Sequence, residues 1–220
     1  MIDTTRQSGI IPDNKVQEIS VAIVGAGSIG SHTAEVLCKM GIRKLRIFDF
    51  DDVEGHNVAN QGYYVPEIGY KKCEALRLRL GAGTGVEIIA ENRKYEAGEK
   101  FQENYVISAV DNMSSRADIW SGFLASVDCR YFLDARMGAR NGSVFYVDKT
   151  SAESISRYDR SLFPDEEAVQ LPCTEKSTIF CAYGLSGLIG ALIAESIIGD
   201  NELNFSVDVD FSNIHMFRNS

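Results

Sequence analysis

Positive charge is scarce in this chain of 220 residues. Lysine and arginine together number 22, against 31 aspartate and glutamate residues, so the formal net charge is −9. Such a balance repels a nucleic-acid backbone unless the basic residues gather in one patch, and no such patch is visible in the sequence. The composition therefore predicts that nucleic acid is not a partner.

Paired cysteines, a leader and long apolar runs are also missing. The chain has an odd number of cysteines without a CxxC pair, namely Cys38, Cys73, Cys129, Cys173 and Cys181. Neither a secretory leader nor an apolar run of membrane length is visible. We therefore expect a cytoplasmic protein without a membrane partner, in which Cys38, Cys73 and Cys129 are small buried hydrophobes.

Histidine is rare as well. His32, His56 and His215 are the only three, and none stands at a spacing typical of a metal site or a Ser-His-Asp triad. We expect them at surface or helix-face positions. The sequence also contains no internal repeat and no low-complexity tract.

What the chain does have is an alternation of apolar segments. Strands are expected at residues 21–24, 45–48, 86–90, 105–110, 131–134, 143–147 and, with weak alternation, 205–211. Helices are expected from residue 28 to Gly41 and at 70–80, 114–125 and 181–198. This alternation predicts one α/β domain with a Rossmann-like, doubly wound, mostly parallel sheet.

The segment 149–176 breaks the pattern because it is polar and has no clear period. It is also longer than ordinary connections, which run about 4–6 residues. We expect a crossover loop or lid within the domain. A disordered insertion is the alternative for the part before Phe163.

Three glycines, Gly25, Gly27 and Gly30, follow the first expected strand. Such a run lets the chain turn sharply, approach a phosphate and start a helix packed on the sheet, and each demand excludes a Cβ. The first N–H groups of that helix lack internal partners and favour an anion. Asp49 stands about 20 residues further on, at the end of the second strand, where a carboxylate can accept from ribose hydroxyls. These features predict a nucleotide site.

Lys72 and Asp111 move the prediction away from redox chemistry. A lysine and a further aspartate beyond the glycines indicate charged side chains that balance the charge of a bound triphosphate. Each has a plainer alternative: Lys72 as a solvated helix lysine, and Asp111 as a cap of the helix that begins near Ser114. Ser114 and Ser115 are the other expected caps of that helix.

The order of these motifs resembles the ThiF/MoeB family, which includes the adenylation domains of ubiquitin-activating enzymes. The similarity runs from Arg6 to about Gly142. The matching positions are Arg6-Gln7, Asp49-Phe50-Asp51-Asp52-Val53, Asn57 with Gln61, Lys72, and Asp111-Asn112 with Arg116.

The resemblance implies a role for most of these positions. Arg6 is expected to reach into the neighbouring subunit's site, which requires a homodimer. Lys72 is expected to contact the phosphates of ATP, and Asp111 to position Mg²⁺. The remaining nucleotide-binding positions are expected to be Gly25, Gly27, Gly30, Asp49, Asp51, Asn57, Gln61 and Asn112, with Asp49 on the ribose.

The chain also departs from the family pattern. Asn60 stands where the family usually has an arginine, so one cationic contact to the phosphates is missing. Lys71, Arg43, an arginine from the expected lid, and Arg136 are the candidates to compensate. Because paired CxxC motifs are absent, no zinc site is expected. Residues 1–220 are therefore expected to form a minimal ThiF/MoeB-like adenylation domain.

Cys173 lies in Pro172-Cys173-Thr174, which resembles imperfectly the Pro-x-Cys-Thr that holds the thioester cysteine of ubiquitin-activating enzymes. A helix that starts near Ser177 would lower the pKa of this thiol through its positive end. Two readings stay open: an acceptor in thioester or sulfur transfer, and a structural or unreactive cysteine.

Together these expectations describe an ATP- and Mg²⁺-dependent adenylyltransferase that activates the carboxyl-terminal carboxylate of a ubiquitin-like protein or peptide. The nucleophile is then the substrate's own carboxylate, so no protein base is required. A non-catalytic partner subunit of the same family is the main alternative, because of Asn60. An NAD- or FAD-dependent oxidoreductase is a further alternative, but it leaves Lys72 and Asp111 without roles.

Overall fold

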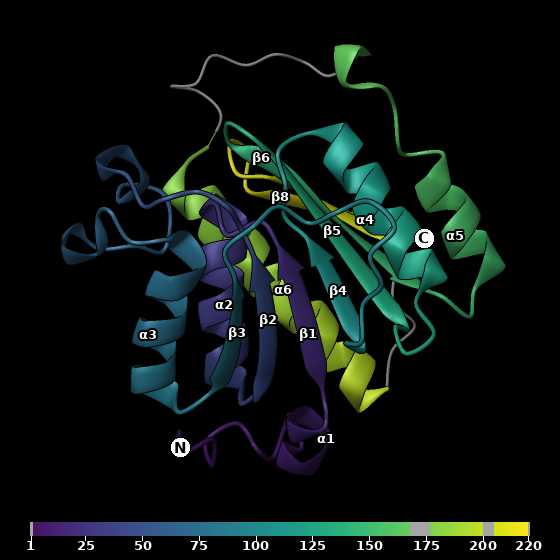
Figure 1. Cartoon of the computed structure of the whole chain (residues 1–220). Coiled ribbons are helices and arrows are strands. Elements are labelled where there is room, and N and C mark those ends of the chain that lie inside the picture. The colour runs from purple at the N-terminus through teal and green to yellow at the C-terminus, as the bar shows by residue number, and fades with distance from the viewer. Residues whose placement is uncertain (1, 168–176, 200–204, 220) are drawn as a thin grey trace.

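The computed structural model describes residues 2–167, 177–199 and 205–219. Within these residues, one eight-stranded sheet has the order β3-β2-β1-β4-β5-β6-β7-β8 (Figure 1). The strands are β1 (Ser20–Val24), β2 (Lys44–Phe48), β3 (Glu87–Glu91), β4 (Tyr105–Ser108), β5 (Tyr131–Gly138), β6 (Asn141–Asp148), β7 (Ser206–Asp210) and β8 (His215–Asn219). The α-helices are α1 (Asp13–Gln17), α2 (Ser28–Met40), α3 (Lys72–Thr84), α4 (Met113–Ala125), α5 (Ala152–Asp159) and α6 (Ile179–Ile198). The short 3₁₀ helices are η1 (Gly55–Asn57), η2 (Val65–Glu67) and η3 (Asp165–Glu167).

Parallel pairing joins β3, β2, β1, β4 and β5, whereas β6, β7 and β8 extend the sheet in antiparallel fashion. From β1 the chain builds outward to β2 and β3 on one side, and it then returns to place β4 on the other side of β1. The carboxyl ends of β1 and β4 are therefore a topological switch point, where doubly wound folds bind ligands. The predicted single-domain, mostly parallel α/β fold is confirmed.

One face of the sheet carries α2, α3 and α6 over a core that is mainly aliphatic. Its fully buried side chains include Ile23, Leu37, Ile42, Ile189 and Ile193. α2 and α6 approach closely, because a Cβ at Gly190 would lie 2.7 Å from Val36 Cγ1. α2 ends at Gly41 and α6 at Gly199, both in the left-handed conformation, as predicted from the glycines.

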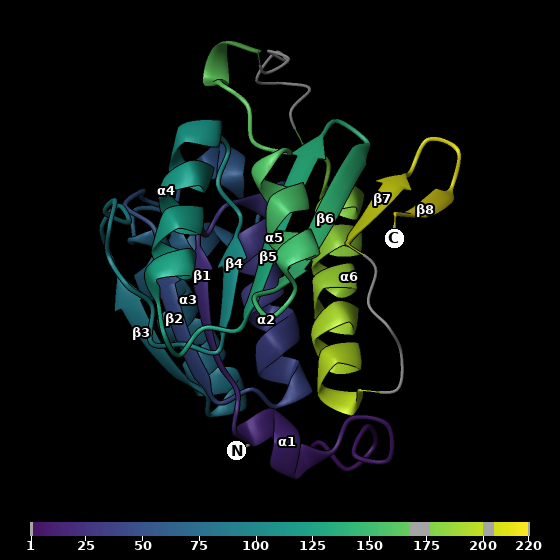
Figure 2. The ribbon, with the colours of Figure 1, turned by 90° about the vertical axis from the view of Figure 1, so that its right-hand side faces the viewer.

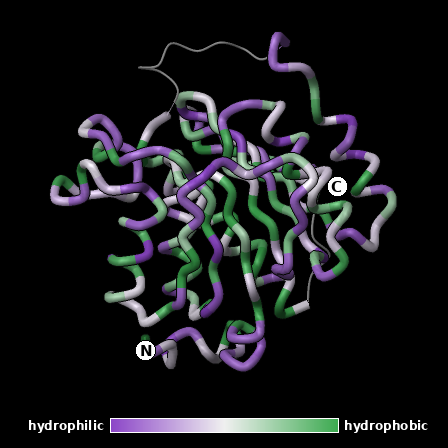
Figure 3. The backbone as a smooth tube through the Cα atoms, in the orientation of Figure 1, coloured by the Kyte–Doolittle hydropathy of each residue, from purple (hydrophilic) through white to green (hydrophobic). Residues whose placement is uncertain are grey.

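The other face carries α4 and α5 over an aromatic core (Figure 2). Trp120 of α4 contacts the rings of Phe132 and Tyr158, and Phe123 packs against Phe132. In Figure 3 most hydrophobic stretches of the chain run through the middle of the molecule, between the two helical layers. The sheet is therefore covered on both faces, as parallel strands require.

α6 is the helix that is long and apolar enough to cross a membrane by length and composition. The sequence was expected to lack such a run, so this expectation is wrong for residues 179–198. In the fold, 56% of its apolar window is buried, and Leu185, Ile189 and Ile193 are fully covered by the sheet and α2. This is the packing of a core helix.

α5 and β8 are among the elements that were not expected from the sequence. α5 forms in the polar segment: Ser151 caps it by accepting from Ser154 N at 3.2 Å, and Tyr158 anchors it in the aromatic core. Because only Ile155 and Tyr158 mark its apolar side, the helical period is too short to detect. The disordered alternative is thus wrong for 152–159. β8 is exposed at every position, so it shows no alternation either.

Candidate nucleotide site

The glycine turn and Asp111 meet at the switch point of the sheet. Gly25 follows β1 with a φ of 96°, in the region that favours glycine. A Cβ there would lie 2.6 Å from the carbonyl oxygen of Ala109, which follows β4. The turn is therefore packed against the backbone that leads to Asp111, two residues further on.

The other two glycines have different structural reasons. A Cβ at Gly30 would lie 1.8 Å from the carbonyl oxygen of Gly25, so packing alone demands glycine. A Cβ at Gly27 would meet no atom within 4 Å in the described part of the chain, so packing does not demand glycine there. No described side chain caps the first turn of α2, and that turn contains no acidic residue. The open space and the uncapped N–H groups fit an anion at the start of α2.

Asp49 is tied to the glycine turn from the end of β2. Its Oδ2 accepts from Ala26 N at 2.7 Å, and its Oδ1 accepts from Asp51 N at 2.9 Å. Burial raises the pKa of this carboxyl, against the opposing effects of the nearby Lys72 ammonium and the two backbone N–H groups. Asp49 therefore fixes the loop that follows β2 against the turn.

Lys72 is buried at the start of α3, with only 6% of its surface exposed. Its Nζ lies 2.9 Å from Asp51 Oδ2, and its backbone N donates to Asp51 O at 3.0 Å. The adjacent Lys71 is exposed and pairs with Asp52 at 2.7 Å. The alternative of a solvated helix lysine is therefore wrong for Lys72. The structure brings Lys72, Asp49 and Asp51 together beside the glycine turn.

Asn57 and Gln61 belong to the loop that packs on this turn. Tyr63 in the same loop donates from its hydroxyl to Ala26 O at 2.7 Å. Asn57 is buried and its Oδ1 accepts from Glu54 N at 2.8 Å, which stabilises η1. Gln61 Oε1 is buried without a hydrogen-bond partner in the part of the chain that the structure describes. Such an acceptor is costly unless a ligand or water donates to it.

The side-chain amide of Asn60 has a hydrogen-bond partner within the chain, the hydroxyl of Ser177. Its Nδ2 donates to Ser177 Oγ, and Ser28 Oγ lies 3.5 Å from the same hydroxyl. Of the expected compensating cations, Arg43 precedes β2 and lies at the opposite edge of the sheet, so that expectation is wrong. Arg136 is held by the buried Asp134 carboxylate.

Asp111 is exposed at the start of the β4–α4 connection, and its Oδ1 accepts from Asn112 Nδ2 at 3.2 Å. Asn112 is the cap of α4, because its Oδ1 accepts from Ser115 N at 2.8 Å and from Ser114 Oγ at 2.9 Å. The expected caps Asp111, Ser114 and Ser115 are therefore wrong. The Asp111 carboxylate stays available at the mouth of the site.

Three charged residues form a buried ion group next to the connection that carries Asp111. The sequence analysis did not predict this group. Asp134 of β5 is fully buried, and its oxygens pair with Arg116 Nη1 at 2.5 Å and with Arg136 Nε at 2.6 Å. Arg116 also donates to Val110 O. The signal in the sequence was the spacing of Asp134 and Arg136, which places both on one face of the strand.

Two expected site residues are not brought to this crevice. Arg6 lies in the amino-terminal segment beneath the sheet, where Gln7 Nε2 donates to Lys39 O at the end of α2 (Figure 1). Within one chain it is therefore at the opposite edge from Asp49 and Asp111. Cys173 lies outside the described residues.

With this geometry in place, a family model decides the classification. The model of the ThiF family matches residues 6–218, nearly the whole chain. The chain belongs to the ThiF family.

Two curated relatives with the same name illustrate the similarity. The chain is 29% identical to ubiquitin-like modifier-activating enzyme 5 of Gallus gallus over 178 residues, which cover 74% of this chain and 42% of that protein. The protein of the same name from Aedes aegypti is 32% identical over 133 residues, 52% of this chain and 33% of that protein. This ThiF-family chain thus spans less than half the length of these relatives.

Solved structures share the fold. PaaA superposes with a TM-score of 0.76 at 16% identity, covering 100% of this chain and 69% of that one. E. coli MccB solved with ATP superposes with a TM-score of 0.71 at 14% identity, covering 94% and 65%. MccB has also been solved with MccA. At these identities the likeness shows the fold alone.

The four described cysteines of this ThiF-family chain are buried. Burial raises the pKa of the Cys129 and Cys181 thiols to about 11 and that of Cys38 to about 12. The prediction that Cys38, Cys73 and Cys129 are buried hydrophobes is confirmed.

His32 lies on a face of α2, which is one of the two expected kinds of position, and it is buried there. Its ring stacks at 4.1 Å on that of Tyr183, and neither ring nitrogen has a hydrogen-bond partner among the residues that the structure describes. Burial lowers the pKa of the imidazole, although Glu35 acts in the opposite direction. His56 and His215 are exposed, as expected.

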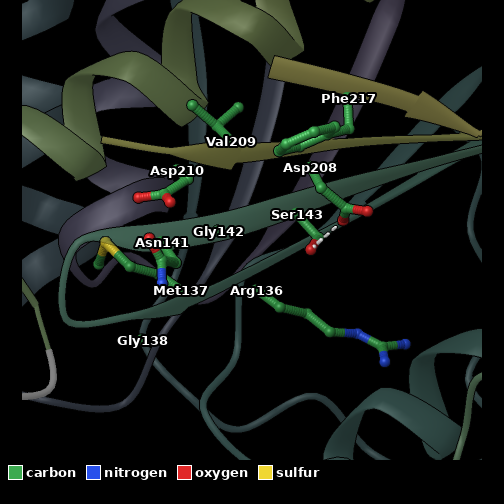
Figure 4. A pocket seen from close by; sticks show the side chains of 10 residues that line it. All are labelled: Arg136, Met137, Gly138, Asn141, Gly142, Ser143, Asp208, Val209, Asp210 and Phe217. Atoms are coloured by element: carbon green, nitrogen blue, oxygen red, sulfur yellow. Dashed lines mark hydrogen bonds between the residues drawn. The ribbon is translucent and has the colours of Figure 1, made fainter. Parts of the chain in front are cut away.

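A hollow lies elsewhere, over the antiparallel strands (Figure 4). It has a volume of about 410 Å³ and is lined mainly by β5, β6 and β7, where Ser143 Oγ donates to Asp208 Oδ1 at 2.5 Å. None of the glycine turn, Asp49, Lys72 or Asp111 lines it. This hollow is therefore separate from the crevice at the switch point.

A dedicated metal cage is not part of the described structure. Residues 2–167, 177–199 and 205–219 contain no group of three or more His, Cys, Asp or Glu side chains placed to hold an ion. Mg²⁺ commonly takes one or two carboxylates together with the phosphates of its nucleotide and waters. A single exposed carboxylate, Asp111, at the end of the sheet where α2 begins without a side-chain cap, would fit that kind of site.

Proposed function

We propose that this chain is an ATP-dependent adenylyltransferase that activates the carboxyl-terminal carboxylate of a ubiquitin-like protein or peptide. The observation that carries the proposal is the buried Lys72, which lies with Asp49 and Asp51 beside an uncapped helix start. A lysine placed there is costly to bury unless it serves a charged partner.

The relatives support the choice of substrate. Curated relatives are named for activating a ubiquitin-like modifier, and MccB of the same fold has been solved with ATP. Because the chain covers less than half of those curated relatives, the substrate assignment is part of the proposal and does not follow from similarity alone.

The reaction needs positioning more than acid–base chemistry. The substrate carboxylate attacks the α-phosphorus of ATP, and the bond from that phosphorus to the pyrophosphate oxygen breaks. Charge gathers on the phosphoryl oxygens, where positioned cations and N–H groups stabilise it. Lys72 and the first N–H groups of α2 supply this stabilisation, and Asp49 and Gln61 orient the ribose and the nucleotide.

Asp111 would hold Mg²⁺, which neutralises charge on the phosphate oxygens when it is bound. Its carboxylate is exposed beside Gly25, and Asn112 takes over the capping of α4. Arg6 is proposed to complete the site of a second copy in a homodimer, because within its own chain it lies at the far edge of the sheet. A thioester or sulfur-transfer step at Cys173 is a further part of the proposal that the described residues leave open.

The first test is ATP–pyrophosphate exchange, followed by mass detection of the adenylate with candidate ubiquitin-like proteins. Lys72→Ala should lower exchange about 10²-fold or more, because it removes a cation from the phosphate site. Lys71→Ala is the matched control, since Lys71 is exposed and pairs with Asp52. Equal activity of the two variants would show that Lys72 has no role at the phosphates.

The second test concerns Asp111. Asp111→Ala should raise the Mg²⁺ concentration needed for exchange and lower the maximal rate, with the melting temperature unchanged. Asp128→Ala, an exposed aspartate at the other end of α4, serves as the control. An unchanged Mg²⁺ requirement in Asp111→Ala would contradict the metal assignment.

A non-catalytic partner subunit remains the second candidate, and Asn60 is the observation that favours it. Its amide is engaged with Ser177 and offers no positive charge to a phosphate. Binding of ATP to the isolated chain, measured by calorimetry, separates the two functions. Absence of ATP binding together with normal folding would favour the partner subunit.

A further inference from the structure

Residues 110–114, which present Asp111, are held from two sides. On the inside, Arg116 donates to the carbonyl oxygen of Val110. On the outside, Asp165 of η3 accepts from Met113 N at 2.5 Å and from Ser114 N at 3.3 Å. Hydrogen bonds therefore hold the connection between β4 and α4 on both sides of Asp111 and Asn112: at Val110 before them, and at Met113 and Ser114 after them.

The inner contact is linked to the chain beyond α5. The buried Asp134 carboxylate joins Arg116 to Arg136. Arg136 in turn donates to Ser161 O at 2.9 Å and to Ser161 Oγ at 3.0 Å, and its guanidinium lies 4.3 Å from the centre of the Phe145 ring. Both sets of contacts to residues 110–114 therefore connect them to the same segment, residues 161–167: one through Ser161 and the other through Asp165.

Directional bonds explain why such a group would be placed here. A buried ion group is often no more stabilising than apolar residues of similar volume, so stability alone is a weak reason for it. Charge-assisted hydrogen bonds do constrain relative geometry, and here each oxygen of Asp134 accepts from one guanidinium, Oδ1 from Arg116 and Oδ2 from Arg136. Asp165 adds a carboxylate at the positive end of α4, where it accepts from the N–H groups of Met113 and Ser114, whereas Asn112 accepts from that of Ser115.

We propose that residues 161–167, acting through Asp165 and through the Arg136–Asp134–Arg116 group, position Asp111. A displacement of this segment then moves the carboxylate end of the nucleotide site. In this proposal Arg116, Asp134, Arg136 and Asp165 act as positioning residues. The metal-binding consequence rests on the proposed function, whereas the mechanical link between the two segments does not.

The link is tested without nucleotide, by amide hydrogen exchange of the whole chain. Arg136→Lys keeps the charge but loses the planar fork that joins Asp134 to Ser161. Exchange should rise about fivefold or more in both 161–167 and 110–114. Arg130→Lys is the matched control, because Arg130 is exposed, precedes the same strand and pairs with Asp148. A rise confined to 161–167, or no rise in either segment, would overturn the link.

The consequence for the site is tested by ATP affinity with Mg²⁺ and with a chelator. Asp165 is half-buried and belongs to neither core cluster, so Asp165→Ala leaves the core intact, and Glu166→Ala, at an exposed position on the same turn, is its control. Asp165→Ala should weaken Mg²⁺-dependent ATP binding about tenfold and leave Mg²⁺-free binding within about twofold. Equal weakening in both conditions, or none, would contradict positioning of Asp111. If the unmodified chain binds no ATP, the proposed function fails, and the exchange experiment still decides the link.

Discussion

The two faces of the sheet hold their parts of the site by different means. The α2–α3–α6 face is mainly aliphatic and presents the glycine turn and Lys72 through the fit of apolar side chains. The α4–α5 face is aromatic and sits beside an ion group that presents Asp111 through hydrogen bonds. Apolar packing depends on volume, whereas the ion group depends on charge and direction. The two halves of one crevice should therefore respond differently to substitutions of equal size.

Gly30→Val should have the largest effect. A Cβ at this position overlaps the carbonyl oxygen of Gly25, so the turn or α2 must move. We expect a loss of about 4 kcal/mol or more in the free energy of unfolding, measured by urea denaturation. Gly27→Ala is the control: it meets no described atom, so stability should change by about 1 kcal/mol at most, while ATP binding weakens. A stable Gly30→Val chain would show that packing does not demand this glycine.

Asp134→Asn should be the next most damaging change, although it alters no volume. A neutral amide leaves two guanidinium groups facing each other without their shared carboxylate. The expected loss is about 3 kcal/mol, read from the denaturation midpoint. A loss under about 1 kcal/mol would remove the contrast between the two faces.

Ile189→Leu is the corresponding volume-conserving change on the aliphatic face. Ile189 is fully buried in α6, and repacking of its neighbours should limit the cost to less than about 1.5 kcal/mol. The same denaturation assay compares it with Asp134→Asn. A larger loss for Ile189→Leu than for Asp134→Asn would reverse the proposed difference.

His32→Phe should have the smallest effect, visible as a change in pH dependence. Because burial lowers the pKa of His32 below its usual 6.5, the folded state binds fewer protons than the unfolded state. Its contribution to stability is therefore complete above pH 6.5 and is lost as the pH falls through the lowered pKa. The drop in melting temperature from pH 7.5 to 5.5 should shrink by about 2–4 °C in the variant. His56→Phe, at an exposed histidine, should leave that drop as it is.

Short-range patterns predicted one half of the site well. The glycine turn and Asp49 lie one strand–helix unit apart, and the helix expected at 70–80 is α3, which begins two residues later, at Lys72. A local period and a turn requirement are enough to place them. The structural reason for each glycine could not be read from the sequence. Only the structure shows that a Cβ would clash at Gly30 and would meet open space at Gly27.

The other half depends on contacts between distant parts of the chain. Arg116 and Asp134 are 18 residues apart, and Asp165 reaches Met113 across 52 residues. Sequence order does not reveal which of several arginines pairs with a buried aspartate, and the polar segment that holds Ser161 and Asp165 has no period to mark its helix. The capping of α4 was misassigned for the same reason: Asp, Asn and Ser all suit that position.

The burial of the four described thiols has a practical consequence for labelling. An alkylating reagent at neutral pH reacts with exposed thiolates, and Cys38, Cys73, Cys129 and Cys181 are both covered and held protonated. A mass increase gained within minutes by the native chain would therefore have to come from Cys173. Reaction of any of the four described thiols would report a local opening of the fold.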